Sequence, residues 1–442
     1  MSPRLRIGVI VALLVVVATV ATAATYLRGP FDGVSSPAAT PTASPGAEPS
    51  GSGAPEPTPE PTPTPRPGEG GTELYGYLPY WQMTEPMAAY LEQVPVSTLA
   101  LFSVSARRNG AVDNRDPGYK RITGPLGRRI IAGAQARGGR VELVFTSFGP
   151  DKNGLFFGRL RRTANAASPD PGAVPSAIAA PTVSAPPPEP PWHRTVTDLA
   201  SLAADLGVDG INVDVEQLDE LDRAAYGAFL GELRSTLRTV APAATLTVAT
   251  EAGLRGTGNA AAAVQAGVDR VFLMGYDYHW SGSQPGASSP VDRSDGLYDL
   301  RWSIEQYVGA GVPRDRILLG LPLYGMSWRT TGPDRTAPVL GRGASWIPNL
   351  HRDVLLDPTF QPGRDPLEIA EFFIRAEDGA WRVTYYDSPA TLRTKLAFAR
   401  DQGLAGGGFW AIGYERGLPG YLDLMHDFRG GKVVREEAPA AR

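Results

Sequence analysis

Residues 208–216 read VDGINVDVE, a short apolar segment that carries polar side chains at every second position. Side chains alternate between the two faces of a strand, so Asn212, Asp214 and Glu216 share one face. An antiparallel strand with one wet face would explain this pattern without any function. A parallel sheet is covered on both faces, however, and a polar row inside it is costly to bury. In such a sheet, the row indicates a site for chemistry.

Asp214 and Glu216 are two residues apart, which separates them by about 6.5–7 Å along a strand. Two carboxyl groups this close do not both ionise at low cost, so one of them should hold a proton near neutral pH. A protonated carboxyl group is what general acid catalysis requires. The pair therefore predicts acid catalysis, and the cleavage of an acetal is the reaction that it favours.

Eight short apolar segments can form the sheet that positions this row. The expected strands are 74–78, 98–104, 140–146, 210–215, 245–250, 270–275, 317–323 and 407–411. Expected helices lie between several of them, at 127–136, 195–206, 224–240, 260–267, 300–309 and 390–403. This α/β alternation predicts a closed (β/α)8 TIM barrel with its chemistry at the carboxyl ends of the strands. A doubly wound sheet is the alternative, but the glycines of 253–258 do not form a G-x-G-x-x-G phosphate loop.

The N-terminal 28 residues are expected to be a signal peptide or an uncleaved signal anchor. Arg4 and Arg6 precede the uncharged apolar run 7–24, which is long enough to cross a bilayer as a helix and could tether the chain to a membrane. Either form places the rest of the chain outside the cytoplasm, in the cell envelope or the extracellular space. The Pro/Thr-rich residues 29–71 are expected to be a disordered linker.

The folded body is expected at 72–430, followed by a disordered tail at 431–442. Two insertions are expected in the body. The Pro-rich stretch 168–191, after the third strand, is expected to be disordered. The stretch 326–390, between the seventh and eighth strands, is too long for a helical crossover and predicts a small α+β subdomain. Its aromatic residues are expected to form the core of that subdomain, and the wall of a glycan cleft is the alternative.

Composition excludes several classes of function. The chain has 46 acidic and 42 basic residues, a formal charge of −4, which argues against nucleic-acid binding. It has no Cys and only four His, and no two His have metal-ligand spacing. We therefore expect no metal and no organic cofactor, and we expect a monomer.

The polar strand and four other segments resemble glycoside hydrolase family 18, which includes chitinases and bacterial peptidoglycan-active glucosaminidases. Residues 209–216 resemble the family's D-G-x-D-x-D-x-E strand. Residues 75–81 (YGYLPYW) resemble its first strand, 274–277 (MGYD) its sixth, 320–325 (GLPLYG) its seventh and 408–410 (GFW) its eighth. The five segments occur in the family's order and span nearly the whole body.

The resemblance implies a role for each matching residue. Glu216 would be the general acid, and the substrate's own N-acetyl oxygen would attack the anomeric carbon in place of an enzyme nucleophile. Asp214, Tyr276 and Asp277 would hold the acetamido group, and Trp410 would stack on the sugar. Other expected substrate contacts are Asn212, Asp209, Tyr77, Trp81, Met274 and His279.

The sequence departs from the family pattern at position 212 and at residues 146–149, and the role of His279 stays open. Asn212 stands where many chitinases have Asp, which removes a charge beside Asp214. Residues 146–149 (TSFG) keep only part of the family's S-x-G-G at the end of the third strand. His279 lies in a loop, 278–290, that resembles the cell-wall members, and a His packed or hydrogen-bonded within that loop is as plausible as a substrate contact.

These observations predict an exported glycosidase that hydrolyses β-1,4 bonds at N-acetylglucosamine units. Peptidoglycan is the favoured polymer because of the loop 278–290 and the Pro-rich spacer, and chitin is the second. A non-catalytic glycan-binding protein on the same barrel is the alternative, and a scaffold without sugar binding is a third hypothesis. The Glu at position 216 favours the enzyme.

Overall fold

The structure, a computed structural model, describes residues 72–159 and 189–433. The expected signal segment and linker, residues 168–188 of the Pro-rich insertion and residues 434–442 of the tail lie outside the described residues. Within the described ranges, no helix has the length and apolar character needed to cross a membrane.

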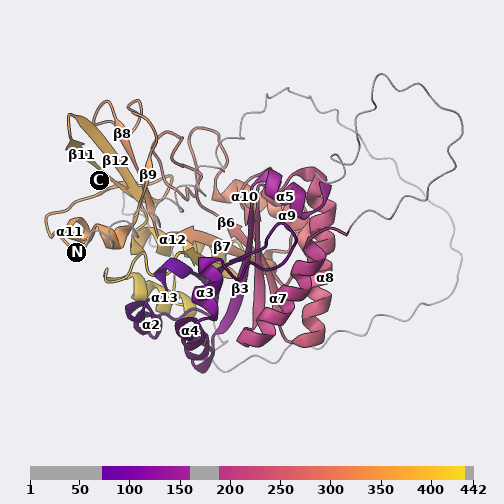
Figure 1. The fold of residues 1–442 in the computed structure, drawn as a ribbon. Helices are drawn as coiled ribbons and strands as arrows, with labels where there is room; N and C mark the ends of the chain where they lie inside the picture. The colour runs from indigo at the N-terminus through magenta and orange to yellow at the C-terminus, as the bar shows by residue number, and fades with distance from the viewer. Residues whose placement is uncertain (1–71, 160–188, 434–442) are drawn as a thin grey trace, which may run out of the picture.

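Eight parallel strands close into a barrel in the order β1-β13-β7-β6-β5-β4-β3-β2. Their bounds are β1 Glu73–Pro79, β2 Thr98–Ser105, β3 Arg140–Phe148, β4 Gly210–Glu216, β5 Thr245–Glu251, β6 Arg270–Met274, β7 Ile317–Pro322 and β13 Gly406–Trp410. Helices surround these strands (Figure 1). The predicted (β/α)8 TIM barrel is therefore confirmed, with all eight strands at the expected places.

The main helices are α2 Glu85–Leu91, α3 Pro117–Thr123, α4 Pro125–Ala136, α5 Pro150–Phe156, α7 Trp192–Leu206, α8 Arg223–Val240, α9 Leu254–Gln265, α10 Leu300–Gly309, α12 Pro389–Asp401 and α13 Tyr421–Arg429. In α7 the residues Val196, Leu199 and Ala203 lie one turn apart and are buried, which is the expected amphipathic pattern. Helix α9 begins six residues before its expected start. Its first turn needs Gly256, because a Cβ atom there would lie 1.7 Å from the carbonyl oxygen of Glu251.

The interior of the barrel is packed mainly with aromatic side chains. Tyr75, Tyr77 and Phe272 contact one another with ring centroids 4.9–5.5 Å apart. Phe272 fits because Gly320 and Gly408 leave room for it. A Cβ atom at either glycine would lie 2.3 Å or 2.7 Å from the ring. This packing gives the polar row on β4 a rigid base.

Between β7 and β13 the chain forms a five-stranded antiparallel sheet in the order β10-β11-β12-β8-β9, which lies to one side of the barrel (Figure 1). Its strands are β8 Gly325–Thr330, β9 Ala344–Trp346, β10 Gly363–Asp365, β11 Ala370–Glu377 and β12 Ala380–Tyr386, with the short helix α11 Arg352–Leu355. Trp346 packs against Phe373 and Tyr386 with centroids 5.7 Å and 5.2 Å apart. This is the inserted α+β subdomain that the sequence predicts.

A buried ion pair joins the inserted subdomain to the barrel. Lys395 of α12 is fully buried and places its Nζ 2.5 Å from Asp387 Oδ1, directly after β12. The same Nζ donates to Ser289 Oγ at 2.8 Å, and Ser289 lies in the loop that follows β6. Lys395 thus connects helix α12, the residue after β12 and the loop after β6 in the interior of the protein.

Candidate active site at the carboxyl end of the barrel

The polar row of β4 faces the interior of the barrel, as predicted. Val213 and Val215 pack in the core between strands and helices. On the other face, Asn212 and Asp214 are buried, and Glu216 at the end of the strand is partly exposed. The row therefore runs from the centre of the barrel to its carboxyl end, where the chemistry of such barrels takes place.

Asn212 is held by two tyrosines of β1. Its Nδ2 donates to Tyr75 Oη at 3.0 Å and to Tyr77 Oη at 2.9 Å. Tyr75 in turn donates to Glu142 Oε2 at 2.5 Å. An Asp at position 212 has no N–H to offer to these hydroxyl groups, so the network is matched to an amide. Tyr77 thus contacts the row through Asn212.

Glu142 is a buried carboxyl group that the sequence analysis missed. It lies on β3 and also accepts hydrogen bonds from Thr245 Oγ1 at 2.6 Å and Thr247 Oγ1 at 2.9 Å. Burial raises its pKa to about 7, although these hydrogen bonds act against the rise. A single carboxyl group in the run RVELVFTSF was the available signal, but it has no partner at a fixed spacing in the sequence.

Asp214 and Glu216 both bind protons more tightly than ordinary carboxyl groups. Burial raises the pKa of Asp214 to about 8, and the charge of Glu251 adds to the effect. Burial and the charge of Asp214 raise the pKa of Glu216 well above its usual value. Asp214 Oδ1 has no hydrogen-bond partner among the described residues. The structure thus supports the prediction that the pair holds a proton near neutral pH.

Glu251, at the end of β5, is a second carboxyl group that the sequence analysis missed. Its Oε1 accepts a hydrogen bond of 2.7 Å from the backbone N–H of Gln217, directly after Glu216. Burial raises its pKa, and its charge acts on both Asp214 and Glu216. Glu251 therefore belongs to the same electrostatic unit as the predicted pair.

The end of β3 fixes the backbone at Glu216. Ser147 Oγ donates to Asn153 Oδ1 of α5 at 2.7 Å. Asn153 Nδ2 then donates to the carbonyl oxygen of Glu216 at 2.7 Å. The partial match of residues 146–149 to the family pattern therefore still provides a support for the expected acid.

Tyr276 and Asp277 follow β6 and lie near the row. Asp277 has a left-handed backbone (φ 62°), and its N–H donates to Ser288 Oγ at 3.0 Å. Its Oδ1 accepts a hydrogen bond of 2.6 Å from Tyr324, two residues after the end of β7. Burial raises the pKa of Asp277 to about 6, and that of Tyr276 well above its usual value. Tyr276 therefore remains a neutral hydroxyl donor at physiological pH.

Aromatic side chains surround this end of the barrel. Trp410, at the end of β13, packs edge-on against Phe102 with centroids 4.7 Å apart. It also contacts Tyr77 at 5.5 Å and Trp81 at 6.4 Å. Trp410 and Trp81 remain partly exposed, whereas Met274 is buried beneath them in the barrel interior. Partly exposed indole rings of this kind can stack on the apolar face of a sugar.

The prediction that Asp209 binds substrate is wrong. Asp209 precedes β4, at the end of the strand opposite to Glu216. Its Oδ2 accepts hydrogen bonds from the backbone N–H of Val141 at 2.9 Å and from Gln135 Nε2 at 3.0 Å. Six to seven strand residues, roughly 20 Å, separate it from the carboxyl end. Its carboxylate holds the start of β3 and β4 together.

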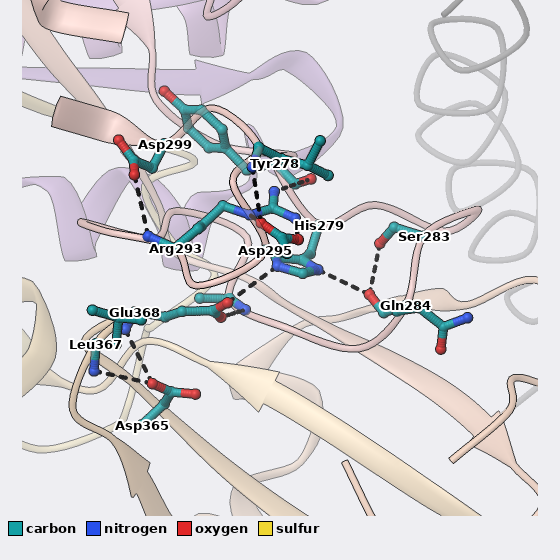
Figure 2. A network of polar contacts seen from close by, with 12 residues as sticks. Tyr278, His279, Ser283, Gln284, Arg293, Asp295, Asp299, Asp365, Leu367 and Glu368 are labelled. Atoms are coloured by element: carbon teal, nitrogen blue, oxygen red, sulfur yellow. Dashed lines mark hydrogen bonds and ion pairs between the residues drawn. The ribbon is translucent and has the colours of Figure 1, made fainter. Parts of the chain in front are cut away.

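Both ring nitrogens of His279 have partners within the protein, which favours the packed alternative over a substrate contact. Its Nδ1 lies 2.9 Å from the carbonyl oxygen of Gln284, and its Nε2 lies 3.2 Å from Glu368 Oε1 of the inserted subdomain. Glu368 Oε2 also accepts a hydrogen bond of 2.6 Å from the N–H of Ala287. Figure 2 shows His279 between the loop and Glu368, with both ring nitrogens occupied. The residue therefore ties the loop to the subdomain.

Among residues 72–159 and 189–433, no group of His, Asp and Glu side chains is arranged to hold a metal ion. The chemistry that the described residues support is proton transfer by carboxyl groups next to a partly exposed aromatic surface.

Comparison with known proteins gives one family. A model of the glycosyl hydrolases family 18 matches residues 193–415. The cortical fragment-lytic enzyme of Bacillus anthracis is 25% identical over 228 residues, which cover 50% of this chain and 50% of that protein. The chain spans about a third to a half of the length of the curated relatives that it matches first.

Solved structures share the fold. The Bacillus cereus spore cortex-lytic enzyme SleL is similar with a TM-score of 0.60 and 19% identity, over 83% of this chain and 76% of that chain. A class V chitinase from Nicotiana tobaccum, solved in complex with NAG4, is similar with a TM-score of 0.63 and 17% identity. That match covers 83% of this chain and 100% of the chitinase chain.

Proposed function

The chain belongs to glycosyl hydrolase family 18, and on this basis we propose that it is a glycosidase acting on glycans that contain N-acetylglucosamine. The observation that carries the proposal is the row of Asn212, Asp214 and Glu216 on the inner face of β4. The raised pKa values of its two carboxyl groups supply a proton donor at the carboxyl end of the barrel. General acid catalysis of acetal cleavage needs such a donor.

In the proposed reaction, Glu216 gives its proton to the glycosidic oxygen as the bond to the anomeric carbon breaks. The acetamido oxygen of the same sugar attacks that carbon, so an oxazolinium forms and no bond to the protein is made. Asp214, Tyr276 and Asp277 hold the acetamido group during this step. Glu216 then takes a proton from the water that opens the oxazolinium, and the configuration is retained.

We propose that the chain acts outside the cytoplasm, with peptidoglycan as its first substrate and chitin as its second. The basic residues Arg4 and Arg6 before the apolar run 7–24 support export or a membrane tether. The Pro-rich linker 29–71 is long enough to let a tethered barrel reach into a cell wall. The protein is proposed to act as a monomer.

The test is hydrolysis of purified peptidoglycan and of N-acetylglucosamine oligomers by the full chain. Release of reducing ends that is lost in Glu216→Gln, and kept in the matched control Glu305→Gln on the exposed face of α10, supports the proposal. Binding of either glycan without release by the unchanged chain contradicts it. That outcome supports the second candidate, a non-catalytic glycan-binding protein.

A further inference from the structure

A cavity lies beside the aromatic residues of the candidate active site, between the inserted subdomain and two loops of the barrel. Its volume is about 540 Å³, and it is lined by Gln82, Asn349, Leu350, Arg352, Arg416 and Gly417. Gln82 ends the 3-10 turn after β1, on which its neighbour Trp81 packs against Trp410 with centroids 6.4 Å apart. The cavity is therefore adjacent to the surface proposed to bind sugar.

Two arginines supply the charge of this cavity. Neither Arg352 nor Arg416 has a side-chain hydrogen bond or an ion pair with another described residue. Two other arginines of the subdomain do have such partners, in the pairs of Arg335 with Asp365 and of Arg382 with Glu377. The cavity thus carries two arginines that form no ion pair with a described carboxylate, and the charge of Arg416 acts without a hydrogen bond on the buried carboxyl group of Glu415.

The guanidinium group of Arg352 lies against the segment that carries Arg416, and both residues line the cavity. A Cβ atom at Gly417 would lie 2.9 Å from Arg352 Cζ, so the Arg352 guanidinium packs against the backbone directly after Arg416. The neighbouring carboxyl group of Glu415 is turned inward and buried. There it accepts hydrogen bonds from Tyr90 Oη at 2.7 Å and from the N–H of Gly413 at 2.8 Å.

The rest of the lining leaves the arginines available to a ligand. Asn349 Nδ2 donates to the carbonyl oxygen of Gly413 at 2.5 Å, which fixes the segment that leads into α11. Leu350 is 60% exposed and gives the rim an apolar surface. Guanidinium groups bind carboxylates through paired, charge-assisted hydrogen bonds, so two arginines that line one cavity suit an anionic ligand.

We infer that this cavity binds a carboxylate carried by the glycan, of the kind that the lactyl ether of N-acetylmuramic acid presents. The inference rests on the proposed function, because the sugar surface beside Trp81 places the substituent near Arg352 and Arg416. The exposed Leu350 suits the methyl group of such an ether. N-acetylglucosamine polymers have no anionic group, so the cavity makes the chain select peptidoglycan strands over chitin.

The test is calorimetric binding to the full chain carrying Glu216→Gln, which prevents turnover. Three probes are compared: a tetrasaccharide alternating N-acetylglucosamine with N-acetylmuramic acid, its methyl ester, and the N-acetylglucosamine tetramer. We expect the acid to bind about tenfold or more tightly than the ester, as for charge-assisted hydrogen bonds. Arg352→Gln and Arg416→Gln should each reduce this ratio, and the double variant should bring it close to one.

Arg137→Gln is the matched control, because Arg137 is an exposed arginine at the opposite end of the barrel. It should keep the ratio. Equal binding of acid and ester by the chain with intact arginines overturns the inference, as does a ratio that survives the double variant. If all three probes bind equally, only the carboxylate site fails. If none of them binds, the proposed function fails with it.

Discussion

Tyr324 donates a hydrogen bond of 2.6 Å from its hydroxyl group to Asp277 Oδ1. The two residues follow the neighbouring strands β7 and β6, and Ser288 Oγ accepts the backbone N–H of Asp277 at 3.0 Å. Asp277 has a left-handed backbone, and hydrogen bonds to its carboxylate and to its backbone N–H thus fix its position. One carboxyl group of the candidate site is therefore oriented by residues that the chemistry itself does not need.

Tyr324→Phe should raise the pKa of Asp277 above about 6, because the hydrogen bond from Tyr324 is what lowers it. We expect kcat/KM on N-acetylglucosamine oligomers to fall about tenfold, and to fall more at pH 6 than at pH 8 since less Asp277 is ionised. A pH–rate profile measures this. Tyr298→Phe, in the loop before α10, is the control. An equal loss at both pH values would contradict the role given to Tyr324.

Asn212→Asp should destabilise the fold, because the amide donors to Tyr75 and Tyr77 are lost and a charge is buried. The added carboxyl group should have a raised pKa in the folded state. The protonated carboxyl group then favours the folded state at low pH, and this contribution to stability is lost as the pH rises. We expect urea unfolding to show a loss of about 1–3 kcal/mol at pH 8 and less at pH 5. Asn109→Asp, on an exposed loop, should show neither effect.

Asp214→Asn should reduce the pH dependence of stability. The pKa of Asp214 is raised to about 8 in the folded state, above its unfolded value. Its contribution to the free energy of unfolding is therefore complete below about pH 4 and lost as pH rises through 8. The variant should gain stability relative to the unchanged chain between pH 5 and pH 8. Asp423→Asn, exposed on α13, is the control, and a constant difference across this range would argue against the raised pKa.

Lys395→Met should break the buried ion pair and leave Asp387 charged and unpaired. Removing one partner of such a pair costs about 3–5 kcal/mol. We expect the double variant Lys395→Met with Asp387→Asn to recover at least half of this loss, because Asn stays neutral and keeps an acceptor for Thr391, which donates to Asp387 Oδ1 at 2.8 Å. Chemical unfolding of both variants measures the difference. A loss below 1 kcal/mol for the single variant would show that the pair does not hold the subdomain.

Much of the fold could be predicted from the sequence, for a physical reason. Parallel strands covered on both faces are short apolar runs, and eight of them alternate with helices here. The row Asn212, Asp214 and Glu216 is visible because it departs from that pattern at a period of two. The apolar content and length of the stretch between β7 and β13 likewise predicted a subdomain with its own aromatic packing.

The rest of the site depends on which strands become neighbours. Glu142 and Glu251 are the single carboxyl groups of β3 and β5, and only the barrel order places them beside the β4 row. Tyr324, after β7, likewise meets Asp277 only because β6 and β7 are neighbours. Asp209 was expected to contact the substrate because it is the first residue of the strand motif, and His279 was a candidate because it lies in the loop that follows Asp277. Asp209 instead lies at the other end of the strand, and His279 packs against Glu368, 89 residues away in the sequence.

The central claim is that Glu216 supplies the proton to the leaving group. Its most direct test compares Glu216→Gln with the unchanged chain on two N-acetylglucosamine glycosides, one with a sugar and one with dinitrophenol as the leaving group. The sugar needs protonation and the phenol does not. We predict a loss of at least a hundredfold in kcat/KM for the sugar substrate and less than tenfold for the dinitrophenyl substrate. Equal losses on both substrates would contradict the assignment of Glu216 as the general acid.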